Sequence, residues 1–226
     1  MLQAIKDRLI VSCQAFEDEP LHSPMIMSKM ALAAMEGGAG GIRANSHDDI
    51  VAIKQEVPLP VIGVVKRNYP DSPVHITPTL REVSELVSAG TDIIALDATY
   101  RPRPSKIELE IFVQSIRLHF PEQLLMGDIS TLSEAIEAER MGFDCISTKL
   151  VGCTPYSSGK SVHDDNYKFL HNLVSTVKIP VIAEGNILTP VMAKRCLEAG
   201  AHSVVVGDAI TRPQQITRRF AESMKA

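Results

Sequence analysis

The chain has 226 residues, of which 45% are hydrophobic and 22% are charged, and this composition fits a single globular domain spanning residues 1–226. Collagen-like and low-complexity proteins are excluded by the ordinary content of 13 glycines and 14 prolines. With 23 lysines and arginines against 27 aspartates and glutamates, the net charge is −4, which argues against nucleic acid as a partner.

No apolar stretch reaches the length of a signal peptide or the ~20 residues of a membrane span, so we expect a cytoplasmic protein without membrane contact. The four cysteines, Cys13, Cys145, Cys153 and Cys196, form no C-x-x-C pair and are expected to stay reduced. The seven histidines form no pair at helical spacing, so the sequence predicts no metal site.

Eight short apolar or β-branched segments predict strands in chain order. They cover residues 10–15, 41–44, 61–66, 93–98, 124–129, 145–149, 181–184 and 203–206. These segments read as continuous apolar runs, a pattern typical of parallel strands that are buried on both faces.

Helical periodicity separates the strands. Helices are predicted over residues 24–35, 79–88 and 131–140, and the last of these begins at Thr131 with a glutamate three positions later, which is a capping box. Thr189 followed by Pro190 predicts another helix start.

A weak internal repeat supports the count of βα units. Helical segments end at Gly37, Gly90, Gly142 and Gly200, each shortly before a strand, as expected for a left-handed residue after a helix. Eight βα units in 226 residues predict an α/β protein with a (β/α)8 TIM-barrel fold. The alternative is an open doubly wound sheet, but that fold usually has fewer strands, and no G-x-G-x-x-G follows the first strand.

Polar residues stand at the carboxyl ends of the predicted strands, which form the active-site face of a barrel. They are Gln14, Arg43, Lys66, Asp97, Asp128, Thr148 with Lys149, Glu184 and Asp208. Long loops over residues 67–78, 100–104 and 151–164 follow strands at the same face. An unpaired charge near a dry core is costly, so the ring indicates a functional site. Mutual ion pairing, for example of Lys66 with Glu184, is the structural alternative.

Two turns are suited to phosphate. Gly185 with Asn186 follows the seventh strand, and Gly207 with Asp208 follows the eighth. Glycine lets backbone amides approach an anion closely, and the loops after these two strands are the usual phosphate site of this fold. Arg212 lies nearby in the sequence and is a candidate for a charge-assisted contact.

Lys66 is the strongest candidate for chemistry. A partly desolvated lysine loses its proton near neutral pH and then serves as a base or as a Schiff-base nucleophile. With Glu184 across the barrel, it would move a proton on and off a carbon beside a carbonyl. Gln14, Arg43 and Asp128 are candidates to orient a sugar phosphate, the predicted small-molecule substrate.

Several motifs resemble those of the N-acetylmannosamine-6-phosphate 2-epimerase family. They are residues 11–15 (VSCQA), 41–44 (GIRA), 64–72 (VVKRNYPDS), 76–79 (ITPT), 94–99 (IALDAT) and 182–187 (IAEGNI). The resemblance implies a TIM barrel of sialic acid catabolism that interconverts N-acetylmannosamine 6-phosphate and N-acetylglucosamine 6-phosphate without an organic cofactor or metal.

The resemblance also implies roles for the candidate residues. Lys66 would be the base at C2 of the ring-opened sugar, and Glu184 its catalytic partner. The remaining residues would hold the substrate: Gln14, Arg43, Asp128, Thr148 and Arg212 for the sugar, and Gly185, Asn186, Gly207 and Asp208, again with Arg212, for the phosphate. The family is often dimeric, so we expect a homodimer.

One stretch departs from the family pattern. Residues 147–154 read STKLVGCT, in which Lys149 replaces a small hydroxyl residue and Cys153 replaces an aromatic one. Asn68 also stands where an acidic residue is common. These departures lie in active-site loops and bear on rate or specificity.

Other readings stay open at this point. A Schiff-base aldolase also needs a lysine on a strand, and a catalytically silent sugar-phosphate sensor also needs the phosphate turns. The last predicted helix, residues 213–224, has an apolar pair at Ile216 and Phe220. We expect this pair to pack against its own barrel, and packing on a partner is the alternative.

Overall fold

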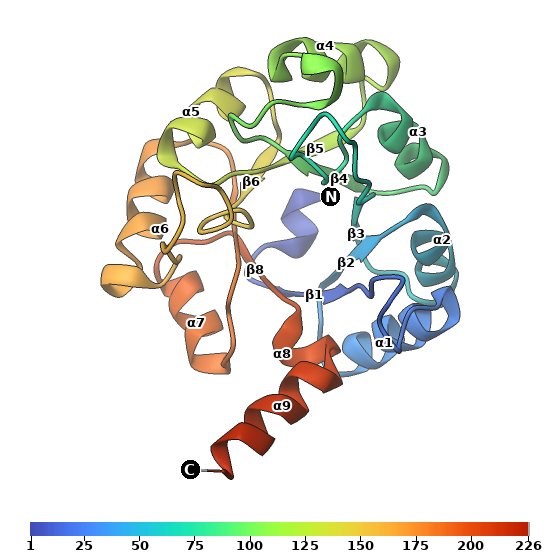
Figure 1. The fold of residues 1–226 in the computed structure, drawn as a ribbon, viewed down its shortest axis with the longest axis vertical. Helices are drawn as coiled ribbons and strands as arrows, with labels where there is room; N and C mark the ends of the chain where they lie inside the picture. Colours follow the sequence, from blue (N-terminus) through green and yellow to red (C-terminus); the bar gives the residue numbers. More distant parts are fainter. Residues whose placement is uncertain (226) are drawn as a thin grey trace.

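The computed structural model describes residues 1–225. Its eight strands pair in parallel in the order β1 to β8 and close into a barrel, and the helices surround it (Figure 1). The prediction of a TIM barrel is therefore confirmed. The strands are β1 (Leu9–Cys13), β2 (Gly41–Asn45), β3 (Val61–Val64), β4 (Ile93–Asp97), β5 (Leu124–Asp128), β6 (Cys145–Ser147), β7 (Val181–Glu184) and β8 (Ser203–Val206).

Helices follow each strand. They are α1 (Pro24–Glu36), α2 (His47–Glu56), α3 (Leu80–Ser88), α4 (Leu109–His119), α5 (Leu132–Arg140), α6 (Asp164–Thr176), α7 (Pro190–Glu198), α8 (Asp208–Thr211) and α9 (Pro213–Ser223), with 3-10 turns η1 (Leu2–Ile5) and η2 (Pro104–Lys106). None of them within residues 1–225 has both the length and the apolar character that crossing a membrane requires.

Local sequence signals set several helix starts as predicted. Thr79 and Thr131 each cap a helix in a full capping box, and Thr189 caps α7 with Pro190 in its first turn. Gly90, Gly142 and Gly200 adopt positive φ after their helices, as expected. The first repeat differs, because Gly38 rather than Gly37 takes the left-handed conformation.

The core has two layers, and this explains why the strands read as continuous apolar runs. One layer lies between the sheet and the helices. The other fills the barrel with side chains such as Ile10, Ile62, Ile93 and Ile182, and Ile5 of η1 packs into it. Packing of the outer layer is tight at β3, where a Cβ on Gly63 would lie 2.6 Å from the Thr91 methyl carbon.

Several strands end earlier than predicted, because the chain leaves the ladder for another partner. β3 ends at Val64, and Lys66 instead forms an antiparallel bridge with Ile76 in a hairpin. β1 ends at Cys13 and β6 at Ser147, so Gln14, Thr148 and Lys149 lie just beyond their strands. The first residues of loops thus hold Gln14, Lys66 and Lys149, whereas Arg43 and Glu184 lie within strands.

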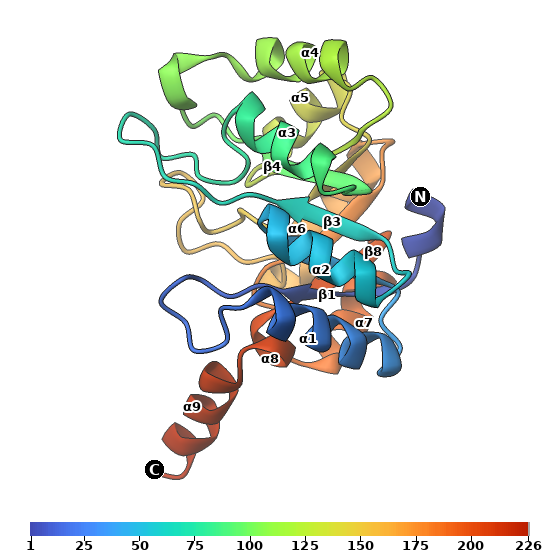
Figure 2. The ribbon, with the colours of Figure 1, turned by 90° about the vertical axis from the view of Figure 1, so that its right-hand side faces the viewer.

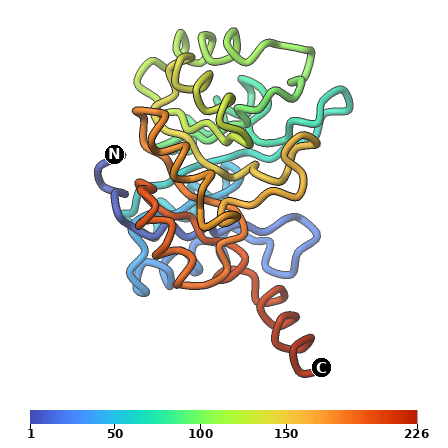
Figure 3. Tube along the Cα trace, turned by 90° about the vertical axis from the view of Figure 1, so that its left-hand side faces the viewer, coloured from blue at the N-terminus to red at the C-terminus, as the bar shows by residue number. Residues whose placement is uncertain are grey.

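The long loops gather at the carboxyl ends of the strands, at the end of the barrel opposite the N-terminus (Figure 2). The last helix is present as α9, but the prediction that it packs against its own barrel is wrong. No residue of α9 is buried, and the helix projects away from the barrel, with Phe220 70% exposed (Figures 2 and 3). Ile216 and Phe220 therefore do not close their own barrel.

Candidate active site

A cavity of about 230 Å³ opens at the carboxyl ends of the strands. It brings together predicted site residues from five parts of the chain: Gln14, Arg43, Lys66, Glu184, Gly185, Asn186, Gly207, Asp208 and Arg212. Phe16, Lys149 and Cys153 line it as well. The structure thus assembles nearly all the predicted residues in one place.

The hairpin after β3 fixes Lys66 at this cavity. The backbone amide of Lys66 donates to Asn45 Oδ1 at 2.9 Å. The hydrogen bond from Thr77 N to Val65 O, also 2.9 Å, closes the hairpin. The Lys66 ammonium donates to Gln14 Oε1 at 2.7 Å and lies 4.6 Å from the centre of the Phe16 ring. The amine is therefore aimed into the mouth of the barrel.

Burial and neighbouring cations lower the pKa of Lys66 to about 7. Loss of solvent is the largest cause, and the charges of Lys149, Arg43 and Arg212 act in the same direction. Glu184 opposes them. A substantial fraction of the Lys66 side chain is thus neutral near pH 7 and able to accept a proton.

Arg43 binds two carboxylates in the floor of the site. Its guanidinium donates to both oxygens of Asp128, at 3.2 and 2.5 Å, and to Glu184 Oε2 at 2.5 Å. All three side chains are buried. Although burial lowers the pKa of Arg43, the two carboxylates outweigh it and raise that pKa above its ordinary value. Arg43 therefore stays charged.

The ion pairs of Arg43 bear on the structural alternative, in which Lys66 and Glu184 pair with each other. Lys66 and Glu184 form no ion pair with each other within residues 1–225, because Arg43 takes the carboxylate. Glu184 Oε2 also accepts from Ser147 Oγ at 3.4 Å. Oε1 of Glu184 has no hydrogen-bond partner in the described chain, and Glu184 lines the cavity, so this oxygen is available to a ligand.

Two predicted sugar-binding residues do not line the cavity. The hydroxyl of Thr148 donates to Glu184 O at 2.7 Å and accepts from Glu184 N at 2.9 Å, which joins the end of β6 to the end of β7. Asp128 lies beneath Arg43 and is fully buried. Burial raises the pKa of Asp128, and the Arg43 charge opposes that rise. Both residues position other groups.

The two phosphate turns border the cavity from β7 and β8. Gly185 has φ +113° and Asn186 has φ +51°, a conformation that turns the chain sharply. The amides of Gly185, Asn186 and Gly207 donate to no other residue in the described part of the chain. Unpaired amides at such turns suit a bound anion.

Arg212 stands at the same rim, but carboxylates already hold it. It pairs with Glu19 and Asp208, each at 3.2 Å, and its guanidinium lies 5.1 Å from the Phe16 ring. Phe16 therefore sits between Lys66 and Arg212. Phe16 was not among the predicted site residues. An aromatic residue two positions after Gln14, at the start of an active-site loop, could have indicated it.

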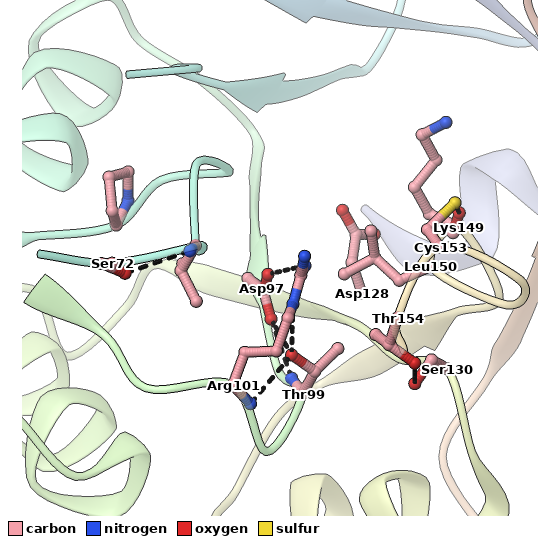
Figure 4. A network of polar contacts seen from close by, with 12 residues as sticks. Ser72, Asp97, Thr99, Arg101, Asp128, Ser130, Lys149, Leu150, Cys153 and Thr154 are labelled. Atoms are coloured by element: carbon pink, nitrogen blue, oxygen red, sulfur yellow. Dashed lines mark hydrogen bonds and ion pairs between the residues drawn. The ribbon is translucent and has the colours of Figure 1, made fainter. Parts of the chain in front are cut away.

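Asp97, another member of the predicted polar ring, serves its own loop. It pairs with Arg101 and accepts from the amide and the hydroxyl of Thr99, at 2.9 and 2.7 Å (Figure 4). No group of three or more potential metal ligands among His, Cys, Asp and Glu occurs in residues 1–225.

Fold and site together define a TIM barrel whose strand ends present a lysine of lowered pKa, a carboxylate bound by an arginine, and two turns whose backbone amides have no partner in the described chain. Comparison with known proteins places the chain more closely. Residues 27–226 match the family described as "Putative N-acetylmannosamine-6-phosphate epimerase", and the chain belongs to this family.

Individual relatives agree with the family match. A protein of Enterobacter sp. (strain 638) is 58% identical over 226 residues, and the match covers 100% of this chain and 96% of that protein. A protein of Clostridium perfringens (strain SM101) is 55% identical over 225 residues, and the match covers both chains in full. Both are named "Putative N-acetylmannosamine-6-phosphate 2-epimerase".

Solved structures agree as well. The N-acetylmannosamine-6-phosphate 2-epimerase from Clostridium perfringens superposes with a TM-score of 0.92 at 54% identity, over 98% of this chain and 95% of that one. A thiamine phosphate pyrophosphorylase from Pyrococcus furiosus shares the fold alone. It is 18% identical and superposes with a TM-score of 0.64, over 100% of this chain and 96% of that one.

Proposed function

We propose that the protein interconverts N-acetylmannosamine 6-phosphate and N-acetylglucosamine 6-phosphate by moving the proton at C2, in the catabolism of sialic acid. The observation that carries this proposal is a lysine with a pKa of about 7 in the same cavity as Glu184, a carboxylate that accepts a hydrogen bond from Arg43. Such a pair suits proton transfer at a carbon beside a carbonyl.

Deprotonation at C2 needs the open-chain sugar, because only the aldehyde at C1 makes that proton acidic. The neutral amine of Lys66 takes the proton. The electron pair of the C2–H bond forms the C1–C2 double bond, and the π pair of the aldehyde moves to its oxygen, which gives the enolate. The amides of Gly185, Asn186 and Gly207 would hold the phosphate, with Arg212. Glu184 Oε1 would accept a hydrogen bond from a sugar hydroxyl.

We infer that Lys66 also returns the proton. Glu184 Oε2 accepts hydrogen bonds from Arg43 at 2.5 Å and from Ser147 at 3.4 Å, so we assign Glu184 to holding the sugar rather than to proton transfer. The protonated amine formed in the first step then supplies the proton to the other face of C2. This requires the enolate to turn in the site before it is reprotonated.

Exchange with solvent tests the reaction. Incubated with the enzyme in deuterated water, N-acetylmannosamine 6-phosphate should gain deuterium at C2 and give the second epimer, which proton NMR follows. Unchanged substrate at high enzyme concentration would defeat the proposal. With C2-deuterated substrate in ordinary water, a fraction of product that keeps its deuterium would support one base, and complete loss would speak for two.

We also propose a homodimer in which α9 packs against a second copy of the chain. The helix leaves Phe220 70% exposed and contacts its own chain chiefly through α8. Phe220→Asp should yield a monomer in light scattering, while Leu118→Asp, at an apolar residue 80% exposed on α4, should leave the dimer intact. A wild-type monomer, or a dimeric Phe220→Asp variant, would contradict the proposal.

We place the enzyme in the cytoplasm, since sugar phosphates are charged and do not cross membranes unaided. Cell fractionation followed by the exchange assay checks this localisation. Recovery of the activity outside the cytoplasmic fraction would overturn it.

A further inference from the structure

Lys149 occupies a fixed place at the edge of the cavity. Its amide donates to Ser147 Oγ at 3.2 Å, and the next residue, Leu150, donates to Ile129 O at 3.2 Å. From this backbone the half-buried side chain extends away from the pair formed by Ser130 and Thr154 (Figure 4). Lys149 lines the same cavity as Lys66 and Glu184.

Lys149 differs from the two arginines that line this cavity. Arg43 is bound by Asp128 and Glu184, and Arg212 is bound by Glu19 and Asp208. The Lys149 ammonium forms no ion pair and no hydrogen bond with any residue from 1 to 225. Its charge is therefore not neutralised by a neighbouring carboxylate.

An ammonium in this position acts on Lys66. Two like charges in one cavity repel, and the repulsion is relieved when one amine releases its proton. After burial, Lys149 is the largest cause of the lowered pKa of Lys66, ahead of Arg43 and Arg212. Phe16 and the hairpin cover Lys66, and burial is the largest cause of its lowered pKa, so Lys66 is the amine on which this repulsion acts.

We propose that Lys149 is a positioning residue for the epimerase reaction: its ammonium keeps the neighbouring Lys66 amine free of its proton, and so ready to take the proton from C2. This inference rests on the proposed function. Other charged or titratable groups line the same two hollows as Lys66. In the cavity they are Arg43, Cys153, Glu184, Asp208 and Arg212, and in the second hollow they are Glu17, Asp18, His22, His47, Asp48, Arg67, His75 and Glu85.

The pH dependence of kcat/KM for C2 exchange tests the proposal. Lys149→Gln should move the acid limb to higher pH, by about one unit, so that activity below the limb falls roughly tenfold while the plateau at high pH is kept. Lys149→Arg, which retains the charge, should keep the wild-type limb. Lys160→Gln removes an exposed lysine farther along the same loop, outside the cavity, and should change nothing.

The split between kcat and KM separates this role from simple binding. A Lys149 that only attracts the substrate would give a variant with raised KM at every pH and an unmoved acid limb. That result would overturn the proposal.

A second measurement does not depend on activity. The rate at which acetic anhydride acetylates Lys66, followed by mass spectrometry of the Lys66 peptide, reports the neutral amine of the free protein as pH varies. In Lys149→Gln this titration should shift upward with the kinetic limb, and an unshifted titration would refute the proposal. If wild-type protein shows no C2 exchange, the proposed function fails, but the acetylation still decides the role of Lys149.

Discussion

Replacing Arg43 by methionine removes the cation that two buried carboxylates share. In the wild-type protein, Asp128 and Glu184 receive three hydrogen bonds from the guanidinium, and the Arg43 side chain is only 1% exposed. Methionine fills a similar volume without charge. The variant therefore tests the electrostatics of the site floor with little change in packing.

The expected loss of folding stability in Arg43→Met is large. Breaking a buried ion pair by removing one partner costs about 3–5 kcal/mol, because the remaining charge stays buried without compensation. For a chain of this length, each kcal/mol lowers the melting temperature by roughly 2–4 °C, so the variant should melt about 10 °C below wild type.

The loss should also depend on pH. Burial already raises the pKa of Asp128, and removing Arg43 takes away the charge that opposes this rise. A folded carboxyl with a raised pKa binds more protons than the unfolded one, so the free energy of unfolding falls as pH rises. The melting difference from wild type should therefore be smaller at pH 5 than at pH 8.

Thermal unfolding followed by circular dichroism at both pH values measures this. The double variant Arg43→Met with Asp128→Asn removes one of the two carboxylate charges and should recover part of the loss. If Arg43→Met melts with wild type at pH 8, or shows the same loss at both pH values, the assignment of an electrostatic role to the buried trio is wrong.

Three further predictions concern Lys66, the proposed base, and the packing at β3. Lys66→Met should abolish C2 exchange yet still bind the sugar phosphate in calorimetry, since the phosphate turns are untouched; retained exchange would rule out Lys66 as the base. In the wild-type enzyme, kcat/KM should fall about tenfold per pH unit below pH ~7, as the Lys66 amine becomes protonated; a profile flat to pH 5 would contradict the pKa of about 7. Gly63→Ala should lose about 1–3 kcal/mol in urea unfolding, because its Cβ would lie within 3.0 Å of Thr91, Ile50 and Leu86; an unchanged midpoint would show that these neighbours relax.

Features set by neighbours in the sequence were predictable. The capping box at Thr131 and the apolar strands depend on residues a few positions apart, and the structure has them where the sequence indicated. The order of the strands then followed from the rule that parallel neighbours are joined by helices. The strands and their order were enough to predict that Lys66 and Glu184 lie at the same end of the barrel.

Long-range pairing was not predictable in the same way. An ion pair between Lys66 and Glu184 was the structural alternative that the sequence raised, whereas Arg43 binds that carboxylate across 141 positions of the chain. For α9 the pattern of Ile216 and Phe220 indicates an apolar face but not what covers it, because packing on the same barrel and packing on a second copy need the same spacing. Lys149 was noted as a member of the polar ring and as a departure from the family pattern, and neither observation indicated its relation to Lys66.

The contacts of Arg43 also bear on how the chain reaches this fold. They join β2 to β5 and to β7 across 85 and 141 positions, so the charge on Arg43 stays in water until the second half of the chain has docked. Contacts so distant in sequence slow folding, because the loop between the partners must close first. During synthesis, the ribosome would release β7 long after β2, and an unfinished barrel would keep its apolar strands exposed in the meantime. The residues that shape the active-site floor thus make barrel closure a late step of folding.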